Sequence, residues 1–265
     1  MPPALSIHGG RIHGGRIHGG PDAQGVPLYD FSTNANACGP CPEALAAVQQ
    51  ADATRYPDPA YTRLREALGA FHAVAPDCIV LAASASECIH RFTALAAWQG
   101  ARLVSVPRHG YGDYAQAAQA RGLAVVHDAA APAGLQWACE PASPLGGVDL
   151  QRARWALKSE APGTPGAASA HPLRVLDCAY APLRLDATLW PERVPGVWQI
   201  WTPNKALGLT GVRAAYAIAP HAEAAHRLAA LAPSWPLGAH GGALLGAWVQ
   251  PSVQRWLADC LPRLC

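Results

Sequence analysis

Residues 201–213 read Trp201-Thr202-Pro203-Asn204-Lys205-Ala206-Leu207-Gly208-Leu209-Thr210-Gly211-Val212-Arg213, and the rest of the chain is organised around them. They hold one of only two lysines in the sequence, the other being Lys158. Small and apolar residues surround Lys205, and such a setting disfavours the ammonium form of a lysine, which lowers its pKa. We therefore expect Lys205 to offer a neutral amine, which is a nucleophile toward aldehydes.

The residues that flank this lysine indicate an anion beside the aldehyde. Thr202 offers a hydroxyl group, and Arg213 offers a two-pronged guanidinium donor that suits a phosphate. An aldehyde next to a phosphate describes pyridoxal 5'-phosphate (PLP). The alternative is that Lys205 is a surface lysine in a glycine-containing turn, so the rest of the chain has to distinguish the two interpretations.

Composition indicates a globular protein with a large apolar core. The chain has 265 residues, of which 51% are hydrophobic and 14% are charged, and its formal net charge is +2. This length suits one large α/β domain, or one domain and a fragment of another. No basic patch indicates a nucleic-acid partner, and no apolar run reaches the roughly 20 residues that cross a membrane. The N-terminus lacks the apolar core of a signal peptide, so we expect a cytoplasmic protein.

The cysteines and histidines do not predict a metal site. The eight cysteines are scattered, and Cys38-Gly39-Pro40-Cys41 is a lone CxxC pair without the second pair that many zinc sites use. A direct repeat of Ile-His-Gly-Gly-Arg fills residues 7–20. Its glycine content cannot build a core, so residues 1–27 are expected to form a flexible tail. Weak metal binding by the histidines of this tail is the alternative.

Predicted strands alternate with predicted helices along the rest of the chain. Strands are expected at residues 28–32, 79–81, 103–106, 123–126, 135–139, 173–176, 197–201 and 214–219, and helices at residues 42–50, 62–73, 87–98, 114–121, 150–158, 221–231 and 239–261. This alternation predicts a mostly parallel sheet covered by helices on both faces. Ligands of such sheets bind at the carboxyl ends of the strands. The polar residues that follow these ends are Ser84, Ser86, Ser143, Asp177, Tyr180, Thr202 and Lys205.

Two of these segments resemble motifs of a known family. Residues 205–213 resemble the SK-x-x-G-L-x-G-x-R pattern, and Leu176-Asp177-Cys178-Ala179-Tyr180 resembles the DEAY stretch, of the fold-type I PLP-dependent enzymes. From about residue 28 to the C-terminus, the sequence is similar to the aminotransferase class I/II group of these enzymes. Asn204 stands where the family pattern has a serine, which removes one hydroxyl group from the expected phosphate site.

The resemblance implies a role for each residue of these two motifs. Lys205 would form a Schiff base with PLP, and Arg213 with Thr202 would hold the phosphate. Asp177 would pair with the pyridine nitrogen and keep it protonated, which makes the ring an electron sink. Tyr180 would hydrogen-bond the phenolic oxygen of the cofactor.

The same resemblance implies further cofactor contacts. The turn Ser84-Ala85-Ser86 would receive the phosphate on backbone N–H groups, because a helix N-terminus suits an anion. Tyr111 would stack on the cofactor ring. Ser143 stands where the family has an asparagine that contacts the phenolic oxygen. Tyr56 would reach across a homodimer to the phosphate of the partner subunit.

Two further segments resemble one branch of the family, the threonine-phosphate decarboxylase-like proteins of cobalamin biosynthesis. They are His18-Gly19-Gly20 with Tyr29-Asp30-Phe31-Ser32-Thr33-Asn34-Ala35-Asn36, and Ala232-Pro233-Ser234-Trp235-Pro236-Leu237. This branch implies decarboxylation of O-phospho-L-threonine to an aminopropanol phosphate. Two alternatives stay open: an aminotransferase that acts on histidinol phosphate or a similar amino acid, and a non-catalytic remnant of a PLP fold.

The resemblance also implies the architecture, a PLP-transferase-like three-layer α/β/α fold with a mostly parallel sheet. Residues 28–235 would form the PLP-binding large domain, and residues 236–265 the start of a C-terminal small domain that is largely missing. The missing part would carry the arginine for the substrate carboxylate, so we expect impaired activity. We also expect Trp248 and Trp256 to be partly exposed, because their packing partner would be absent.

Overall fold

The structure is a computed structural model. It describes residues 11–13, 16–18, 20–21, 25–26, 33–128, 130–143, 146–157, 172–185 and 192–265. The chain separates into two compact units, Met1–Ala35 and Asn36–Cys265, and each is treated by itself below. The predicted strand at residues 28–32 lies outside the described residues.

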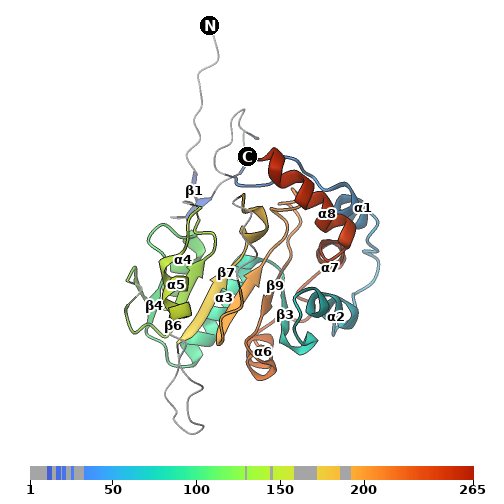
Figure 1. The fold of residues 1–265 in the computed structure, drawn as a ribbon. Helices are drawn as coiled ribbons and strands as arrows, with labels where there is room; N and C mark the ends of the chain where they lie inside the picture. Colours follow the sequence, from blue (N-terminus) through green and yellow to red (C-terminus); the bar gives the residue numbers. More distant parts are fainter. Residues whose placement is uncertain are drawn as a thin grey trace. The chain divides into compact units, whose positions relative to one another are not determined.

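The N-terminal unit contains a short pairing of strands within the Ile-His-Gly-Gly-Arg repeat (Figure 1). The strand β1 (Arg11–His13) runs antiparallel to β2 (Arg16–His18), with Ile12 opposite Ile17. Both strands have the sequence Arg-Ile-His, so the pairing joins two copies of the repeat. The flexible tail over residues 1–27 remains a prediction.

The second unit is built on a seven-stranded sheet. Its strands are β3 (Ile79–Ala82), β4 (Leu103–Ser105), β5 (Ala124–Val126), β6 (Leu135–Cys139), β7 (Leu173–Asp177), β8 (Val197–Trp201) and β9 (Ala215–Ile218). They lie in the order β3-β9-β8-β7-β6-β4-β5. The strand β9 is antiparallel to both of its neighbours, and every other neighbouring pair in this sheet is parallel. The sheet is therefore mostly parallel, which confirms the predicted fold class.

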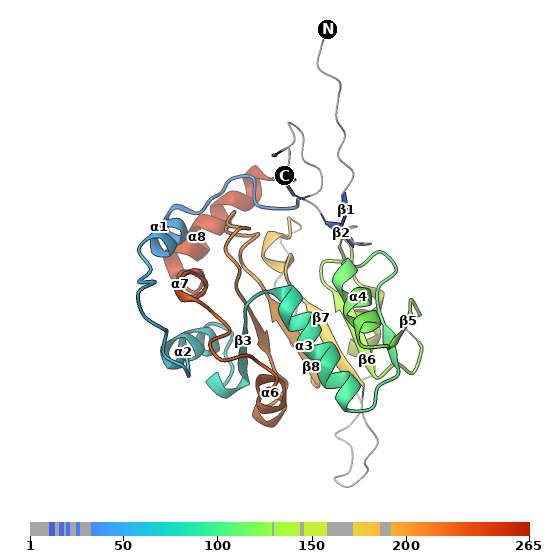
Figure 2. The same ribbon diagram turned by 180° about the vertical axis from the view of Figure 1, so that it is seen from behind.

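Helices cover both faces of this sheet. The α-helices of the unit are α1 (Pro42–Gln49), α2 (Thr62–Phe71), α3 (Ala85–Trp98), α4 (Gly112–Ala120), α5 (Leu150–Leu157), α6 (Ala222–Ala229), α7 (Ala239–Trp248) and α8 (Pro251–Cys260), and single 3-10 turns are η1 (Pro76–Cys78), η2 (Ala181–Leu183) and η3 (Leu261–Arg263). Figure 2 shows α3 lying across one face, whereas α1, α7 and α8 gather together in both views. In the described part of the chain, no helix is long and apolar enough to cross a membrane.

Caps and prolines explain where the helices differ from prediction. The single helix predicted over residues 239–261 is two helices, α7 and α8, because Pro251 has no N–H to continue the helical hydrogen bonds. The helix α3 begins at Ala85, earlier than predicted. The Ser84 hydroxyl accepts a hydrogen bond from the Glu87 N–H and so caps the first turn.

Two hydrophobic cores lie on the two faces of the sheet. Ile79 and Leu81 of β3 belong to the core that α1, α2 and α7 cover, while Val80 and Ala82 belong to the core under α3, α4 and α6. Alternate residues of a strand point to opposite faces. Because both faces are buried, the strands appear in the sequence as continuous apolar runs rather than as alternating ones. The unit therefore has three layers, helix on sheet on helix.

The C-terminal helices pack more completely than the sequence suggested. Trp248 of α7 is 0% exposed, so the expectation of an exposed side chain is wrong at this position. Its indole Nε1 donates to the Tyr216 hydroxyl at 3.1 Å, and its ring meets Phe71 edge-on. The helix α7 packs against α1 and α2, which precede the sheet in the sequence and supply the missing partner. Trp256 of α8 is only partly buried, as expected.

A histidine is buried among aromatic rings in this core. His72 follows α2, its Nε2 lies 2.8 Å from the Tyr216 hydroxyl, and its ring centre lies 4.9 Å from that of Trp201. Burial, with a smaller effect of the nearby Arg193, lowers the pKa of His72 from 6.5 to about 4. Near pH 5 the folded protein therefore keeps His72 neutral, whereas the unfolded chain protonates it.

We predict that the protein loses stability as the pH falls from 6.5 toward 4, because the unfolded chain then binds a proton that the folded chain does not. A shift of this size lowers the free energy of unfolding by up to roughly 3 kcal/mol. Urea denaturation at several pH values measures the slope, which His72→Phe should flatten. His226 of α6 is exposed, so His226→Phe is the control and should keep the wild-type slope. Identical slopes in all three proteins would show that other groups cause the dependence.

Candidate active site

Lys205 lies in the turn that follows β8. That strand ends at Trp201, and Lys205 is partly buried. Burial lowers the pKa of the Lys205 amine; the Asp177 carboxylate opposes this shift and the Arg213 guanidinium reinforces it. The lysine, the carboxylate and the guanidinium picked out in the sequence therefore share one electrostatic environment.

The register of the sheet brings Asp177 to this turn. The strands β7 and β8 are parallel neighbours, and Asp177 at the end of β7 is the partner of Ile200, next to the end of β8. Both strands therefore end at the same edge of the sheet. Tyr180 follows on the β7 side, and the Nζ atom of Lys205 lies 5.2 Å from the centre of its ring, within the range of a cation–π contact.

Both oxygens of the buried Asp177 carboxylate accept hydrogen bonds. Oδ1 accepts from the Ala179 N–H at 2.9 Å, and Oδ2 accepts from the Tyr114 hydroxyl at 2.6 Å. Such donors replace the water that a carboxylate loses on burial. Sequence analysis did not identify Tyr114 as a site residue. Its only signal was the pattern Tyr111-x-x-Tyr114, which places two tyrosines one helical turn apart.

The start of α3 lies beside Tyr111 and Arg213. The N–H groups of Ala85 and Ser86 precede the first hydrogen bonds of the helix, and no described residue accepts from them. The Ser86 hydroxyl lies 3.2 Å from the Tyr111 hydroxyl. Partial burial raises the pKa of Tyr111, and the nearby Arg213 opposes the shift. The predicted phosphate turn and the predicted phosphate arginine thus flank the same tyrosine.

The hydroxyl of Thr202 is hydrogen-bonded to acceptors of its own chain near the lysine turn. Its side chain is buried, and its hydroxyl lies 2.9 Å from both the Asn204 Oδ1 and the Ala214 carbonyl oxygen. A hydroxyl has one hydrogen, so it donates to one of these acceptors at a time. A phosphate would have to compete with both internal acceptors for this hydrogen, which is a constraint that the sequence did not show.

Ser143 lies in the loop that follows β6. Its backbone N–H faces the sulfur of Cys139, which itself lies beside the Asp177 carboxylate. Glu140 anchors the loop, because its buried carboxylate pairs with Arg184 at 2.9 Å. The next residues of the predicted motif, 144–145, lie outside the described residues.

Tyr56 does not belong to the group around Lys205. It is 79% exposed, and its ring stacks on Trp235 with the ring centres 4.5 Å apart. The Trp235 Nε1 donates to the Pro57 carbonyl at 3.0 Å. The segments Arg55-Tyr56-Pro57 and Ala232–Leu237, which the sequence singled out separately, therefore form one surface feature. The contact of Tyr56 with a partner's phosphate stays a prediction.

A distant segment braces the backbone of the lysine turn. The Asn36 N–H donates to the Lys205 carbonyl at 2.9 Å, and the Asn36 side-chain amide donates to the Ala206 carbonyl at 2.9 Å. Gly39 and Gly208 meet backbone to backbone, and a Cβ added to either would lie 2.8 Å from the Cα of the other. Gly208 also has φ = +65°, which favours glycine.

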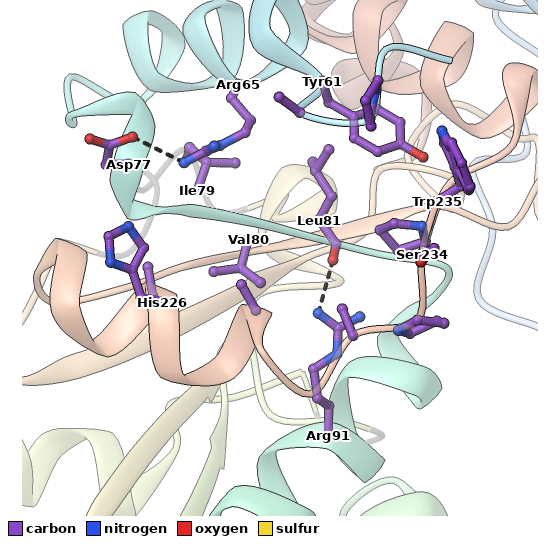
Figure 3. Close-up of a pocket in the computed structure, with 17 residues that line it drawn as sticks. Tyr61, Arg65, Asp77, Ile79, Val80, Leu81, Arg91, His226, Ser234 and Trp235 are labelled. Atoms are coloured by element: carbon purple, nitrogen blue, oxygen red, sulfur yellow. Dashed lines mark hydrogen bonds and ion pairs between the residues drawn. The ribbon is translucent and has the colours of Figure 1, made fainter. Parts of the chain in front are cut away.

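A separate pocket of about 310 Å³ lies beside β3 (Figure 3). Its walls include residues of β3, α2 and α6 and the segment Ala232–Pro236. None of the predicted site residues lines it. Its two guanidinium groups are paired with acids, Arg65 with Asp77 and Arg91 with Glu87, and Arg91 also donates to the Leu81 carbonyl. We therefore do not place the cofactor in this pocket.

The groups around Lys205 fit PLP by their chemistry. They combine an amine of lowered pKa, a buried carboxylate, a guanidinium group and N–H groups at a helix start. An aldehyde, a basic ring nitrogen and a phosphate each find a complement among them. Within the described ranges, no three His, Cys, Asp or Glu side chains are placed to hold a metal ion.

The family described as aminotransferase class I and II matches residues 26–164. Histidinol-phosphate aminotransferase 2 of Thiobacillus denitrificans is 31% identical over an alignment of 242 residues, and the match covers 82% of this chain and 64% of that protein. Histidinol-phosphate aminotransferase of Ruegeria pomeroyi is 31% identical over an alignment of 217 residues, and the match covers 73% of this chain and 57% of that protein. The chain thus spans less than two thirds of the length of these relatives.

Solved structures share the fold. Histidinol-phosphate aminotransferase from Sinorhizobium meliloti in complex with PLP has a TM-score of 0.70 and 22% identity, covering 87% of this chain and 66% of that one. L-threonine-O-3-phosphate decarboxylase from Porphyromonas gingivalis has a TM-score of 0.67 and 19% identity, and the match covers 84% of this chain and 70% of that one. The family and the PLP-bound relative imply PLP as the cofactor. The curated relatives support the histidinol-phosphate aminotransferase alternative better than the decarboxylase that the sequence motifs favoured.

We predict that Gly208→Ala destabilises the lysine turn. The positive φ of Gly208 strains any residue that has a Cβ, and the close contact with Gly39 leaves no room for a methyl group. The free energy of unfolding should therefore fall by about 1–3 kcal/mol. Gly211→Ala is the matched control, because a Cβ there meets no atom within 4 Å. Thermal denaturation of both variants measures the difference, and equal melting temperatures would refute this packing constraint.

Proposed function

The chain belongs to the aminotransferase class I and II family, and we propose that it forms the cofactor-binding part of a PLP-dependent aminotransferase for phosphorylated amino compounds of the histidinol-phosphate type. The observation that carries this proposal is the convergence of Lys205, Asp177 and Arg213 where β7 and β8 end. When bound, PLP supplies an electron sink for the negative charge that develops on the substrate carbon. The residues described below bind and orient it and move protons.

Lys205 is the proposed covalent anchor and proton carrier. Its lowered pKa raises the share of neutral amine at a given pH, and only the neutral amine attacks an aldehyde. As a neutral amine, Lys205 would also be the candidate general base for the proton at the substrate carbon. One side chain would thus serve in both binding and proton transfer.

Asp177 is proposed to hold the ring nitrogen in its protonated form. A buried carboxylate gains from a positive partner, and a protonated pyridine is such a partner. Tyr180, whose ring lies 5.2 Å from the Lys205 amine, is proposed to donate to the phenolic oxygen of the cofactor. Ser143 is proposed to contact the same oxygen from the loop after β6, in place of the asparagine of the family pattern.

The phosphate is proposed to bind at the start of α3. The N–H groups of Ala85 and Ser86 carry the partial positive charge of a helix N-terminus, and Ser84 fixes their direction by capping the helix. Arg213 would add a two-pronged charged donor. Tyr111, whose hydroxyl meets that of Ser86, is proposed to stack on the cofactor ring.

Two further contacts with the phosphate are proposed, one from Thr202 and one from Tyr56 of a second subunit. Thr202 is proposed to share its hydroxyl with the phosphate, in competition with its internal acceptors. We also propose a homodimer, in which Tyr56 contacts the phosphate bound by the partner subunit. The exposed position of Tyr56, braced by Trp235, supports this assignment because a side chain buried in its own subunit could not reach a neighbour.

A second candidate function is decarboxylation of O-phospho-L-threonine. The segments at residues 18–36 and 232–237 favour it, whereas the fold, which solved structures of both kinds of enzyme share, does not separate the two functions. Both candidate substrates carry an amine and a phosphate, so recognition of these groups does not separate them. The reactions differ in which bond at the substrate carbon is held in line for cleavage. A protein that binds the cofactor without turnover is the third possibility.

We predict that the purified protein with PLP shows a visible absorbance band that borohydride removes. Lys205→Ala should abolish the band, because it removes the amine that binds the aldehyde. Lys158→Ala, which changes the only other lysine of the sequence, is the matched control and should keep it. A band of full intensity in Lys205→Ala would exclude Lys205 as the anchor.

We further predict that histidinol phosphate is consumed beyond one equivalent per site only when a keto acid is present, because continued transamination needs an acceptor for the amino group. Amino-acid analysis of the reaction mixture measures the transferred amine. Release of CO2 from O-phospho-L-threonine without a keto acid would instead identify the decarboxylase. Absence of both reactions, with the absorbance band present, would identify a non-catalytic protein.

A further inference from the structure

We propose that Tyr114 is a positioning residue for Asp177, whose carboxylate it holds in a fixed direction for the cofactor's ring nitrogen. This inference rests on the proposed PLP site, and it adds a residue that the motifs did not indicate. The two side chains come from different elements, Tyr114 from the first turn of α4 and Asp177 from the end of β7. Their contact therefore exists only in the folded chain.

The hydrogen bond between them is short and fully enclosed. The Tyr114 hydroxyl and the Asp177 Oδ2 are 2.6 Å apart, and the residues are 1% and 4% exposed. A hydrogen bond between a hydroxyl and an ionised carboxylate is stronger than one between neutral groups, especially away from water. Removal of the hydroxyl would leave Oδ2 without this donor in a place that water does not freely reach.

The tyrosine ring is held rigidly, so the hydroxyl has a defined direction. The Tyr114 ring stacks on Trp137 with the ring centres 4.7 Å apart and an angle of 14° between the planes. Tyr111 meets the same ring edge-on at 6.0 Å. Because packing already fixes the ring, little conformational entropy remains to be lost when the hydroxyl meets the carboxylate.

The charges around the pair make the tyrosine the donor. Burial and the Asp177 carboxylate raise the pKa of Tyr114 well above its usual value, so the hydroxyl keeps its proton. Burial and the same carboxylate raise the pKa of the neighbouring Cys139, whose thiol lies 3.3 Å from the Pro141 carbonyl as a donor. The Cys139 sulfur is a second neighbour of the Tyr114 hydroxyl, but the Asp177 carboxylate at 2.6 Å is the stronger acceptor for the one hydrogen of that hydroxyl.

The result is a carboxylate with a neutral donor on each oxygen. The Ala179 N–H serves Oδ1 and Tyr114 serves Oδ2, so both oxygens are fixed in direction. Each oxygen keeps a further lone pair for a positive partner. A carboxylate fixed in this way can pair with a protonated pyridine nitrogen, whereas a ring without that nitrogen gains nothing from it.

The test is the affinity of the full-length apoprotein for two ligands, PLP and its 1-deaza analogue, in which carbon replaces the ring nitrogen. Tyr114→Phe keeps the ring and its stacking but removes the hydroxyl. We expect this variant to bind PLP about tenfold more weakly than the wild type and the analogue within about twofold. The 15N signal of bound, labelled PLP should shift toward that of the unprotonated ring in this variant.

Tyr216→Phe is the matched control, because Tyr216 is equally buried and its hydroxyl serves His72 and Trp248 instead. It should weaken the binding of PLP and of the analogue by equal factors. If Tyr114→Phe does not fold, 4-fluorophenylalanine is placed at position 114, because its fluorine fills the volume of the hydroxyl without donating a hydrogen bond. The affinities of this variant for PLP and for the 1-deaza analogue are then compared in the same way.

Equal weakening of both ligands by Tyr114→Phe, or no weakening of either, would overturn the inference and leave the proposed function intact. Failure of the wild type itself to bind PLP would overturn both.

Discussion

The site depends on one constraint, a carboxylate buried beside a partly buried amine at the edge where β7 and β8 end. Removing an ionised carboxylate from water costs several kcal/mol unless hydrogen bonds and opposite charges replace the water. Asp177 receives an N–H from its own loop and a hydroxyl from α4, and it faces the amine of the turn after β8. Asp177 thus interacts with three separate elements, the loop after β7, the helix α4 and the turn after β8.

The amine of Lys205 is subject to opposing influences. Burial and Arg213 disfavour its charged form, and Asp177 favours it, with the net effect of a lowered pKa. The backbone below it is fixed by Asn36, which donates to two carbonyls of the turn, and by the close approach of Gly39 and Gly208. Buried carbonyls need such partners. The reactive end of the side chain is therefore tuned by charge, and its base is set by backbone packing.

The choice between aminotransferase and decarboxylase is not made by the residues around Lys205. A lysine, a carboxylate and a phosphate-binding turn serve both reactions, since both develop negative charge on the same substrate carbon. The segment Ala232–Leu237 resembles the decarboxylase branch. Its exposed Trp235 stacks on Tyr56, and neither residue belongs to the group around Lys205. The curated relatives, which are histidinol-phosphate aminotransferases, therefore weigh more than this segment in the proposed reaction.

Local patterns in the sequence were sufficient to predict most elements. The strands β6 and β8 have their predicted bounds because apolar runs between turn residues mark buried strands. Lys205 and Asp177 were singled out by motifs that follow such strands, and the structure brings both residues to one edge of the sheet, while their roles remain a proposal. The bond of Tyr114 to Asp177 and the burial of Trp248 were missed, because an aromatic residue in a helix has the same local pattern whether it packs, binds or lies exposed. Sheet register and helix packing alone decide such contacts between residues distant in the sequence.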